Sequence, residues 1–472
     1  MQLRDYQKQG VDEIRQAFKD GYRRAIYVLP TGGGKTCVFA AIAFGLMQRN
    51  KRAYILVHRE ELLKQGSNML KTFNVPHGLL QGARYGLPNS NIIVASVQTL
   101  TRRLDLMPEP DLIICDESHR SVSPSYQRIF QKWNKSYLLG VTATPKRLDG
   151  KPLGDIYETM IEGPSVSWLI ANGFLAKYKA FAARAKLDLS GVHTRMGDFA
   201  INEIAAIMRS REVIGDAVNG YREHANSQPA IAFCCSVSHA MDVAEMFRQA
   251  GYRSTHIDGG MDEAERTDAI QGLANGKYHV LTSCELISEG LDIPVCAASI
   301  LMRPTQSVAL ALQQMGRCLR PHPQKPHAVI LDHGNVLAMH GLPDSERAWS
   351  LRDDPKKKSG ESATRGTVTC QSCFAKFSPA LKECPRCGTP REVNEIEINY
   401  VDGDIVEITE ELRAKMLSDS AEQAKMKKER EALERYAKKM GYQRGWVEHV
   451  MRSKLEKKAK NLAEKMKQQQ LV

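Results

Sequence analysis

A glycine-rich turn between two apolar segments is the feature that most limits how this chain can fold. Residues 30–36 read Pro-Thr-Gly-Gly-Gly-Lys-Thr, after the strand-like run 25–29 and before the helix-like run 37–43. Glycines at such a turn let backbone N–H groups converge on phosphate oxygens at the helix N-terminus. Lys35 can then reach the β- and γ-phosphates, and the Thr36 hydroxyl can bind Mg²⁺. The pattern predicts a nucleoside triphosphate site.

Two adjacent acids further along the chain support this interpretation. Asp116 and Glu117 directly follow the apolar, strand-like run 111–115. Asp116 can bind Mg²⁺ together with Thr36, and Glu117 can polarise the attacking water. Each motif alone has a simpler alternative: a solvated acidic turn, or a glycine turn without nucleotide chemistry, since Leu29 replaces the usual first glycine. Their occurrence together favours an ATP-hydrolysing site.

Strand-like runs alternate with helix-like segments twice along the chain. This alternation predicts an α/β protein with two lobes, each built from βαβ units around a parallel sheet. Nucleotide sites in such sheets lie at the carboxyl ends of the strands, where both motifs fall. The runs are 25–29, 53–57, 91–95, 111–115 and 137–141, then 230–234, 278–282, 297–301 and 327–331; the helix-like segments include 60–73, 240–250 and 308–320.

Further short motifs follow in a fixed order between residues 1 and 335. They are Leu-Arg-Asp-Tyr-Gln at 3–7, Val-His-Arg-Glu-Glu-Leu at 57–62, Ala-Ser-Val-Gln-Thr-Leu at 95–100, Val-Thr-Ala-Thr-Pro at 141–145, Ile-Ala-Phe-Cys-Cys-Ser at 231–236, Thr-Ser-Cys at 282–284, Ser-Glu-Gly-Leu-Asp-Ile-Pro at 288–294 and Gln-Gln-Met-Gly-Arg-Cys-Leu-Arg at 313–320. With the two motifs above, this series resembles superfamily-2 helicases and translocases. The resemblance implies two RecA-like lobes facing one ATP cleft.

The resemblance also implies a role for each motif. Gln7 would read the edge of the adenine, and Arg4 would support it. The implied nucleotide-binding residues are Arg4, Gln7, Thr31, Gly32, Gly33, Gly34, Lys35, Thr36, Asp116, Gly290, Asp292 and Gln313. The resemblance implies that the nucleic-acid backbone is contacted by Arg59, Thr99 and Thr282. It also implies that hydrolysis is coupled to strand contact by His119, Thr142 and Thr144.

Two arginines end the motif series. Negative charge grows on the γ-phosphate during hydrolysis, and arginines delivered from a second lobe can stabilise it. Arg317 and Arg320 are three residues apart, so on one helix both would face the same cleft. A solvated helix face is the ordinary reading of such a pair. Its position after the other motifs favours a catalytic set of Lys35, Asp116, Glu117, Arg317 and Arg320.

Four of the eleven cysteines form two closely spaced pairs. Cys370 and Cys373, then Cys384 and Cys387, are Cys-x-x-Cys pairs separated by ten residues. This spacing is typical of a structural, tetrahedral Zn²⁺ site with four thiolates. The alternative is disulfides. The other seven cysteines lie within apolar runs, as reduced core residues would.

Length and composition favour several domains and a polyanion as partner. The 472 residues suffice for about three domains, and the net charge of +12 favours nucleic acid. No leader segment and no apolar run long enough for a bilayer is evident, so we expect a cytoplasmic protein of a bacterial or phage-infected cell. The predicted domains are lobe 1 at 1–165, lobe 2 at 166–345, a linker at 346–366, a zinc ribbon at 367–392 and a helical basic tail at 393–472.

Lobes followed by a four-cysteine ribbon are most similar to RadD-like DNA repair proteins of bacteria and their phage relatives. That resemblance implies an ATP-dependent DNA helicase or translocase that uses ATP, Mg²⁺ and Zn²⁺. Repair or recombination proteins are possible partners through the ribbon or tail, and no membrane partner is expected. DNA is favoured over RNA by the form of the motifs. An RNA helicase, or an ATP-gated DNA clamp or adaptor that does not separate strands, is the alternative.

Overall fold

The computed structural model describes most of the first 352 residues and a few short pieces beyond them. The described ranges are 2–82, 84–86, 90–146, 152–183, 189, 192–195, 198–209, 211–284, 293–352, 368–369, 376–377, 383, 389–390 and 405–407. The chain divides into two compact units, residues 1–407 and 408–472, and the second lies outside the described residues. The four zinc cysteines, Gly290, Asp292 and most of the predicted linker and tail also lie outside them, so those assignments stay predictions.

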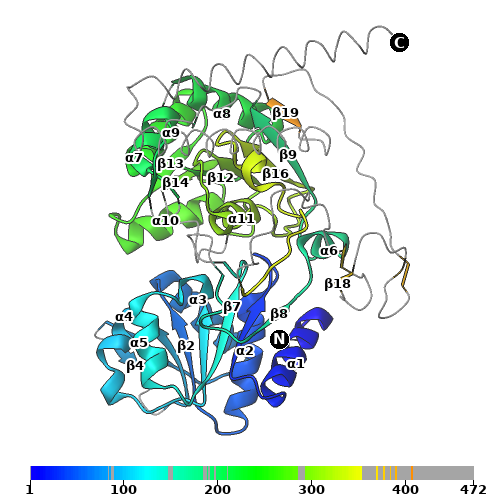
Figure 1. Ribbon diagram of the computed structural model, residues 1–472. Helices are drawn as coiled ribbons and strands as arrows, with labels where there is room; N and C mark the ends of the chain where they lie inside the picture. The colour runs from blue at the N-terminus through cyan, green and yellow to red at the C-terminus, as the bar shows by residue number, and fades with distance from the viewer. Residues whose placement is uncertain are drawn as a thin grey trace, which may run out of the picture. The chain divides into compact units, whose positions relative to one another are not determined.

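An eight-stranded sheet forms the centre of the first lobe, in the order β4-β3-β5-β2-β6-β7-β1-β8 (Figure 1). Its neighbouring strands are parallel except for β3 and β4. All residues of β2 and β6 are buried, as expected for a parallel sheet that is covered on both faces. The strands are β1 (Arg24–Val28), β2 (Ala53–Val57), β3 (Gly78–Gln81), β4 (Arg84–Gly86), β5 (Ile92–Ser96), β6 (Leu112–Asp116), β7 (Tyr137–Thr142) and β8 (Thr159–Glu162).

Helices pack on both faces of this sheet. On one face α1, α2 and α3 pack in series, and on the other α4 packs beside α5. Gly10 lets α1 approach the sheet, because a Cβ at this position would lie 2.4 Å from the hydroxyl oxygen of Tyr27. The helices are α1 (Asp5–Lys19), α2 (Lys35–Met47), α3 (Glu60–Thr72), α4 (Val97–Arg102) and α5 (Pro124–Lys132), with 3-10 turns η1 (Leu104–Leu106) and η2 (Ser118–Arg120).

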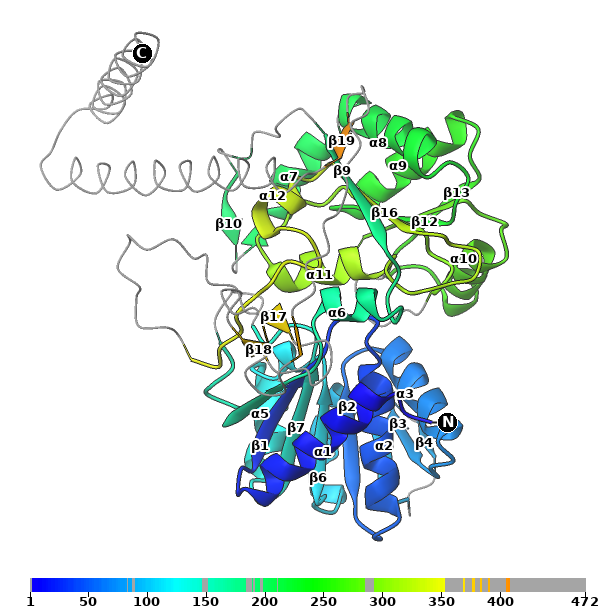
Figure 2. The ribbon, with the colours of Figure 1, turned by 90° about the vertical axis from the view of Figure 1, so that its right-hand side faces the viewer.

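The second lobe repeats this plan around a seven-stranded sheet in the order β13-β14-β12-β15-β16-β9-β19 (Figure 2). All neighbours are parallel except β9 and β19. The strands are β9 (Tyr178–Ala183), β12 (Ala230–Phe233), β13 (Ser254–Ile257), β14 (Val280–Ser283), β15 (Ala298–Leu301), β16 (Ala328–Asp332) and β19 (Ile405–Glu407). The helices are α7 (Ile201–Met208), α8 (Arg211–His224), α9 (Val237–Gln249), α10 (Glu263–Ala274), α11 (Val308–Gly316) and α12 (Val336–His340).

The strands predicted from the sequence are confirmed to within two residues at each end. The sequence also predicts an extra strand or hairpin within 177–194, and β9 forms at the start of this range and joins the second sheet beside β16. Between β8 and β9 lies the short helix α6 (Val166–Ala171). Two small antiparallel pairs complete the described elements: β10 (Thr194–Arg195) with β11 (Asp198–Phe199), and β17 (Val368–Thr369) with β18 (Lys376–Phe377).

Two further expectations concern the redox state of the cysteines and membrane-spanning segments. The seven cysteines at described positions are free, and six of them are buried, which confirms their assignment as reduced residues of the lobes. Among the described helices, none is both long and apolar enough to cross a bilayer.

Candidate functional site

Residues 30–36, the predicted phosphate-binding loop, follow β1 and run into the first turn of α2. Gly34 is the N-cap of α2 and has φ of 89°, and Gly32 has φ of 83°; this backbone region favours glycine. A Cβ at Gly34 would lie 2.3 Å from Nε2 of Gln7, so the loop also passes too close to α1 for a larger residue. The loop therefore leads directly into the N-terminus of α2, a 13-residue helix, where free backbone N–H groups can bind an anion.

The acid pair, Asp116 and Glu117, lies at the carboxyl end of β6. Asp116 is buried, while Glu117 adopts the left-handed conformation with φ of 48°, so the strand turns sharply between the two carboxylates. Burial, together with the charge of Glu117, raises the pKa of Asp116 to about 7. A strained turn that holds a desolvated acid is typical of a functional site rather than of a core.

Lys35 faces both carboxylates from the first turn of α2. Its Nζ donates to the carbonyl oxygen of Leu29 at 3.4 Å, and burial lowers its pKa while Glu117 and Asp116 partly oppose that shift. A buried carboxylate of raised pKa beside Lys35 fits a hard divalent cation, because such a cation would favour the charged form of Asp116. Thr36 and Asp116 are the residues that would hold Mg²⁺.

The helix expected over 308–320 is confirmed from 308 to 316 but ends four residues early, so the two arginines of the second lobe lie beyond it. α11 ends at Gly316, and residues 317–320, the finger turn, follow it as a turn whose first residue, Arg317, keeps helical dihedral angles as the C-cap. The turn tightens because the N–H of Leu319 bonds to the carbonyl of Gly316 at 3.3 Å, while the carbonyl of Leu319 accepts the N–H of Ala176 at 2.7 Å. Pro321 then prevents the helix from resuming.

The finger turn nevertheless lies against the phosphate-binding loop. A Cβ on Gly316 would lie 2.8 Å from Cβ of Thr31, and one on Gly32 would lie 3.6 Å from Cγ of Arg320. The charges of Arg317 and Arg320 also act to lower the pKa of Lys35. The predicted catalytic residues of the two lobes are thus brought together around one cleft.

Gln313, on α11, also reaches across this cleft. Its Nε2 donates to Oε2 of Glu117 at 3.5 Å, and Nδ1 of His119 lies 3.3 Å from the same carboxylate oxygen. Glu117 is therefore contacted from its own lobe by His119 and from the other lobe by Gln313. Thr142 and Thr144, the other predicted coupling residues, pair with each other nearby: the Thr142 hydroxyl donates to the Thr144 carbonyl at 2.9 Å.

Gln7 and its neighbours link α1 to the loop. Nε2 of Gln7 donates to the carbonyl of Gly33 at 3.3 Å, and the hydroxyl of Tyr6 donates to the same oxygen at 2.8 Å. The guanidinium of Arg4 lies over the ring of Phe174, with 4.7 Å from Cζ to the centroid. Gln7 and Arg4 thus lie beside the loop, where the resemblance expects adenine recognition.

Of the three predicted nucleic-acid contacts, Arg59 and Thr99 follow the neighbouring strands β2 and β5 of the first lobe, and Thr282 lies on β14 of the second. Arg59 precedes α3 as its N-cap, and the Thr99 hydroxyl accepts the N–H of Gly82 at 2.9 Å. The Thr282 side chain is fully buried, and its hydroxyl donates to the carbonyl of Ala240 at 2.7 Å. In this arrangement the Thr282 hydroxyl is not open to a phosphate.

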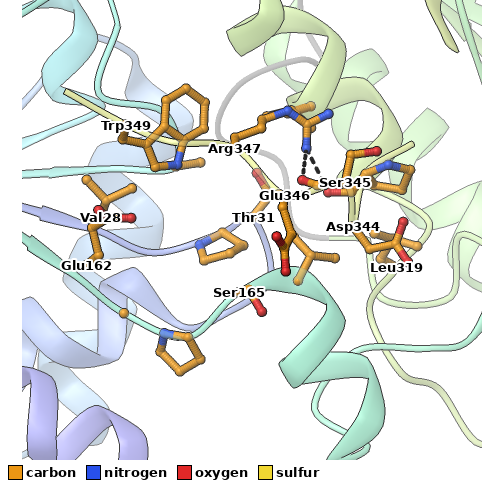
Figure 3. A pocket seen from close by; sticks show the side chains of 18 residues that line it. Val28, Thr31, Glu162, Ser165, Leu319, Asp344, Ser345, Glu346, Arg347 and Trp349 are labelled. Carbon is orange, nitrogen blue, oxygen red and sulfur yellow. Dashed lines mark hydrogen bonds between the residues drawn. The ribbon is translucent and has the colours of Figure 1, made fainter. Parts of the chain in front are cut away.

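Sequence reasoning missed several residues around the loop. Trp168 and Phe174 pack on Tyr6, with centroid distances of 5.8 and 5.1 Å, and so join α6 to α1. A pocket of about 80 Å³ lies behind the loop, where Figure 3 shows Thr31 and Trp349 among its lining side chains. The aromatic residues of 166–174 were the available signal, but nothing in the sequence tied them to the first helix.

Family comparisons agree with this geometry. Residues 1–147 match the family described as "Type III restriction enzyme, res subunit", and residues 210–322 match the "Helicase conserved C-terminal domain". Both matched ranges contain the motifs described above.

Similar proteins occur in a phage and in yeast. A 51.5 kDa protein of a Lactococcus phage (isolate 7-9) is 34% identical over 367 residues, which are 78% of each chain. A Saccharomyces cerevisiae protein assigned as the ATP-dependent helicase IRC3 is 30% identical over 75% of this chain and 54% of the yeast protein. This chain thus spans about half the length of that yeast relative.

A solved structure supports the fold. A fragment assigned as the HsdR subunit of a type I restriction enzyme from Vibrio vulnificus YJ016 superposes with a TM-score of 0.58 at 20% identity, over 72% of this chain and 65% of that chain. The chain belongs to the superfamily-2 helicases, with two RecA-like lobes, and is an ATP-hydrolysing enzyme.

Proposed function

We propose that the protein is an ATP-dependent DNA helicase or translocase whose ATPase site is shared between the two lobes. The observation that carries this proposal is the approach of the end of α11 and the finger turn to the phosphate-binding loop, with Gly316 against Thr31 and Arg320 against Gly32. A site completed only when two lobes meet can couple hydrolysis to their relative movement.

Each group has a distinct task in the proposed reaction. Lys35 binds the β- and γ-phosphates, and Mg²⁺ held by Thr36 and Asp116 would neutralise phosphate charge. Glu117 accepts a proton from the attacking water. The contacts from His119 and Gln313 orient the Glu117 carboxylate for this step. Arg317 and Arg320 stabilise the charge that grows on the γ-phosphate. Gly290 and Asp292 are further candidates that lie outside the described residues.

DNA is the polyanion that the observations favour. The net charge of +12 supports nucleic-acid binding in general. The first lobe matches a family named after a restriction enzyme subunit, a class that acts on DNA, and the form of the motifs points the same way. We propose that Arg59 and Thr99 contact the DNA strand. Thr282 would need a local rearrangement to take part, because its side chain is buried. An RNA helicase remains the second candidate.

ATP turnover measured with matched nucleic acids tests the proposal. Single-stranded DNA, duplex DNA, forked DNA and RNA of the same sequence are compared at equal phosphate concentration, together with strand displacement on the forked DNA. We expect DNA to stimulate turnover more than RNA. Stimulation by RNA alone would favour the second candidate. Stimulated turnover without displacement or movement along the strand would favour an ATP-gated clamp.

The C-terminal part is proposed to carry a structural zinc. The coordinating residues are Cys370, Cys373, Cys384 and Cys387, all outside the described residues; within those residues no group of three or more His, Cys, Asp or Glu side chains forms a metal site. We expect about one Zn per molecule by metal analysis, lost in Cys384→Ser, with basal ATPase retained. A role in DNA repair, with partners bound through the ribbon or tail, rests on the RadD-like arrangement.

A further inference from the structure

A lysine turns inward from an otherwise exposed loop directly after the finger turn. Residues 321–326 read Pro-His-Pro-Gln-Lys-Pro, and Lys325 is 6% exposed while the prolines at 321 and 323 and Gln324 are exposed. The loop holds its shape through a backbone bond from the N–H of Lys325 to the carbonyl of His322 at 3.0 Å and through the fixed φ of its prolines. The loop is therefore built to direct this one side chain into the lobe.

The Lys325 ammonium joins three segments. Its Nζ donates to the carbonyl of Cys318 at 2.7 Å and to the carbonyl of Cys296 at 2.8 Å. Cys318 is in the middle of the finger turn, between Arg317 and Arg320, and Cys296 precedes β15. The side chain thus fastens the finger turn to the central part of the second sheet.

Two other hydrogen bonds act before the finger turn, in the last turn of α11, and near the end of the finger turn. The carbonyl of Gln314, in the last turn of α11, accepts the hydroxyl of Ser299 at 3.0 Å, and the carbonyl of Leu319 accepts the N–H of Ala176. Past a helix end the carbonyls have no helical partner and need others. Lys325 supplies that partner at the midpoint of the turn.

Burying a lysine to satisfy two carbonyls carries a large desolvation penalty. Among the described residues Lys325 forms no ion pair, its two acceptors are neutral carbonyls, and burial lowers its pKa. The negative end of α11 compensates in part, because cations near a helix C-terminus are favoured. A neutral polar side chain or a backbone turn would have served a merely structural purpose.

We infer that Lys325 is a positioning residue for ATP hydrolysis: it fixes the finger turn so that Arg317 and Arg320 meet the γ-phosphate when the lobes close. The inference rests on the proposed function of the two arginines. Lys325 itself contacts neither nucleotide nor metal in this assignment. Its effect therefore belongs in the turnover number rather than in ATP affinity.

The test replaces Lys325 by Met, which keeps most of the length and removes the donor. We expect DNA-stimulated kcat to fall at least about tenfold, while KM for ATP and the Kd for ATPγS stay within about twofold. Arg253→Met is the matched control. Arg253 also donates to two loop carbonyls of the second lobe, those of Lys277 at 2.9 Å and Gly276 at 2.9 Å, but away from the finger turn. It should leave kcat unchanged.

A double-mutant cycle separates positioning from general stability. In an Arg317→Ala/Arg320→Ala background, Lys325→Met should lower kcat no further, because the groups that it positions are gone. If the arginine substitutions alone leave turnover normal, the proposed function of the arginines fails, whatever Lys325 does. If they lower turnover and Lys325→Met either has no effect or adds its full factor, the inference about Lys325 is overturned.

A folding defect in the Met variant does not end the test. Lys325→Gln removes the charge and keeps a hydrogen-bond donor, and circular dichroism checks that each variant retains its secondary structure. A folded Gln variant with lowered kcat and normal ATPγS binding supports the inference. A folded Gln variant with normal kcat overturns it.

Discussion

The two lobes build their halves of the ATP site in different ways. In the first lobe Lys35 lies in the first turn of α2 and Asp116 at the carboxyl end of β6, so each is fixed by a regular secondary-structure element. In the second lobe Arg317 and Arg320 lie beyond the end of α11, on a turn held by hydrogen bonds from Ala176 and Lys325. The first half is set by local geometry, and the second by contacts between segments distant in sequence.

This difference suits an enzyme whose two lobes are proposed to move relative to each other during ATP hydrolysis. Binding of the phosphates needs a fixed cradle, which a strand–loop–helix unit provides. Delivery of charge in the transition state needs groups that arrive with the second lobe and are rigid once there. We therefore expect substitutions in the first lobe to remove ATP binding or chemistry outright, and those in the second to slow turnover of bound ATP.

Lys35→Ala should have the largest effect. The substitution removes the cation proposed to bind the β- and γ-phosphates, and we expect hydrolysis to fall by on the order of 1,000-fold, near the detection limit. The fold should be intact, because among the described residues the ammonium makes one long hydrogen bond, to the carbonyl of Leu29 at 3.4 Å. ATPase assays and a thermal melt on the same preparation check both statements. Normal turnover in a normally folded variant would refute the assignment of the loop.

Glu117→Gln should separate binding from hydrolysis. The amide keeps the shape of the carboxylate but cannot accept a proton, so we expect ATP binding to persist and turnover to fall by on the order of 100-fold or more. The trapped ATP state should also hold DNA longer, seen as slower dissociation from a labelled strand in ATP than in ADP. Loss of ATP binding would instead make Glu117 a structural residue, for example through its contact with His119.

Arg317→Ala and Arg320→Ala test the second lobe. Each should lower DNA-stimulated turnover by on the order of 100-fold and leave ATP affinity nearly unchanged, since the arginines act mainly in the transition state. DNA should then accelerate the variants poorly, because lobe closure no longer delivers the missing charge. Weak ATP binding with normal turnover at saturating ATP would place these arginines outside the catalytic cleft and remove the contrast between the lobes.

The same contrast explains what the sequence could predict. Nine strands, the glycine loop and the acid pair were readable because each depends on residues within a short window. The end of α11 at Gly316 was not, since the residues up to Arg320 favour a helix by themselves and bonds from Ala176 and Lys325 decide otherwise. Lys325 itself gave no signal, because its loop of prolines and polar residues reads as a solvated turn.

A second contact between the lobes provides the finest test of the comparison. Away from the phosphate-binding loop, Nη1 of Arg266 on α10 lies 2.7 Å from Oε1 of Glu61 on α3, and each side chain is 19% exposed. Lys64 and Glu263 form a further ion pair between the same two helices. These pairs hold the lobes in the arrangement in which the finger turn meets the loop.

Arg266→Ala should therefore have the smallest effect. The effect should be seen mainly in the absence of nucleic acid. A partly buried ion pair contributes about 1 kcal/mol, so we expect basal ATPase without nucleic acid to fall about fivefold. DNA-stimulated turnover should change less, because DNA bound across both lobes, as proposed, would itself hold them together. The charge swap Glu61→Arg with Arg266→Glu should restore much of the basal rate, whereas Arg248→Ala, which breaks the Arg248–Glu245 pair within α9, should leave it unchanged. A rise in basal rate in Arg266→Ala would mean that the paired arrangement inhibits hydrolysis, and the second lobe would then be held back from the site rather than presented to it.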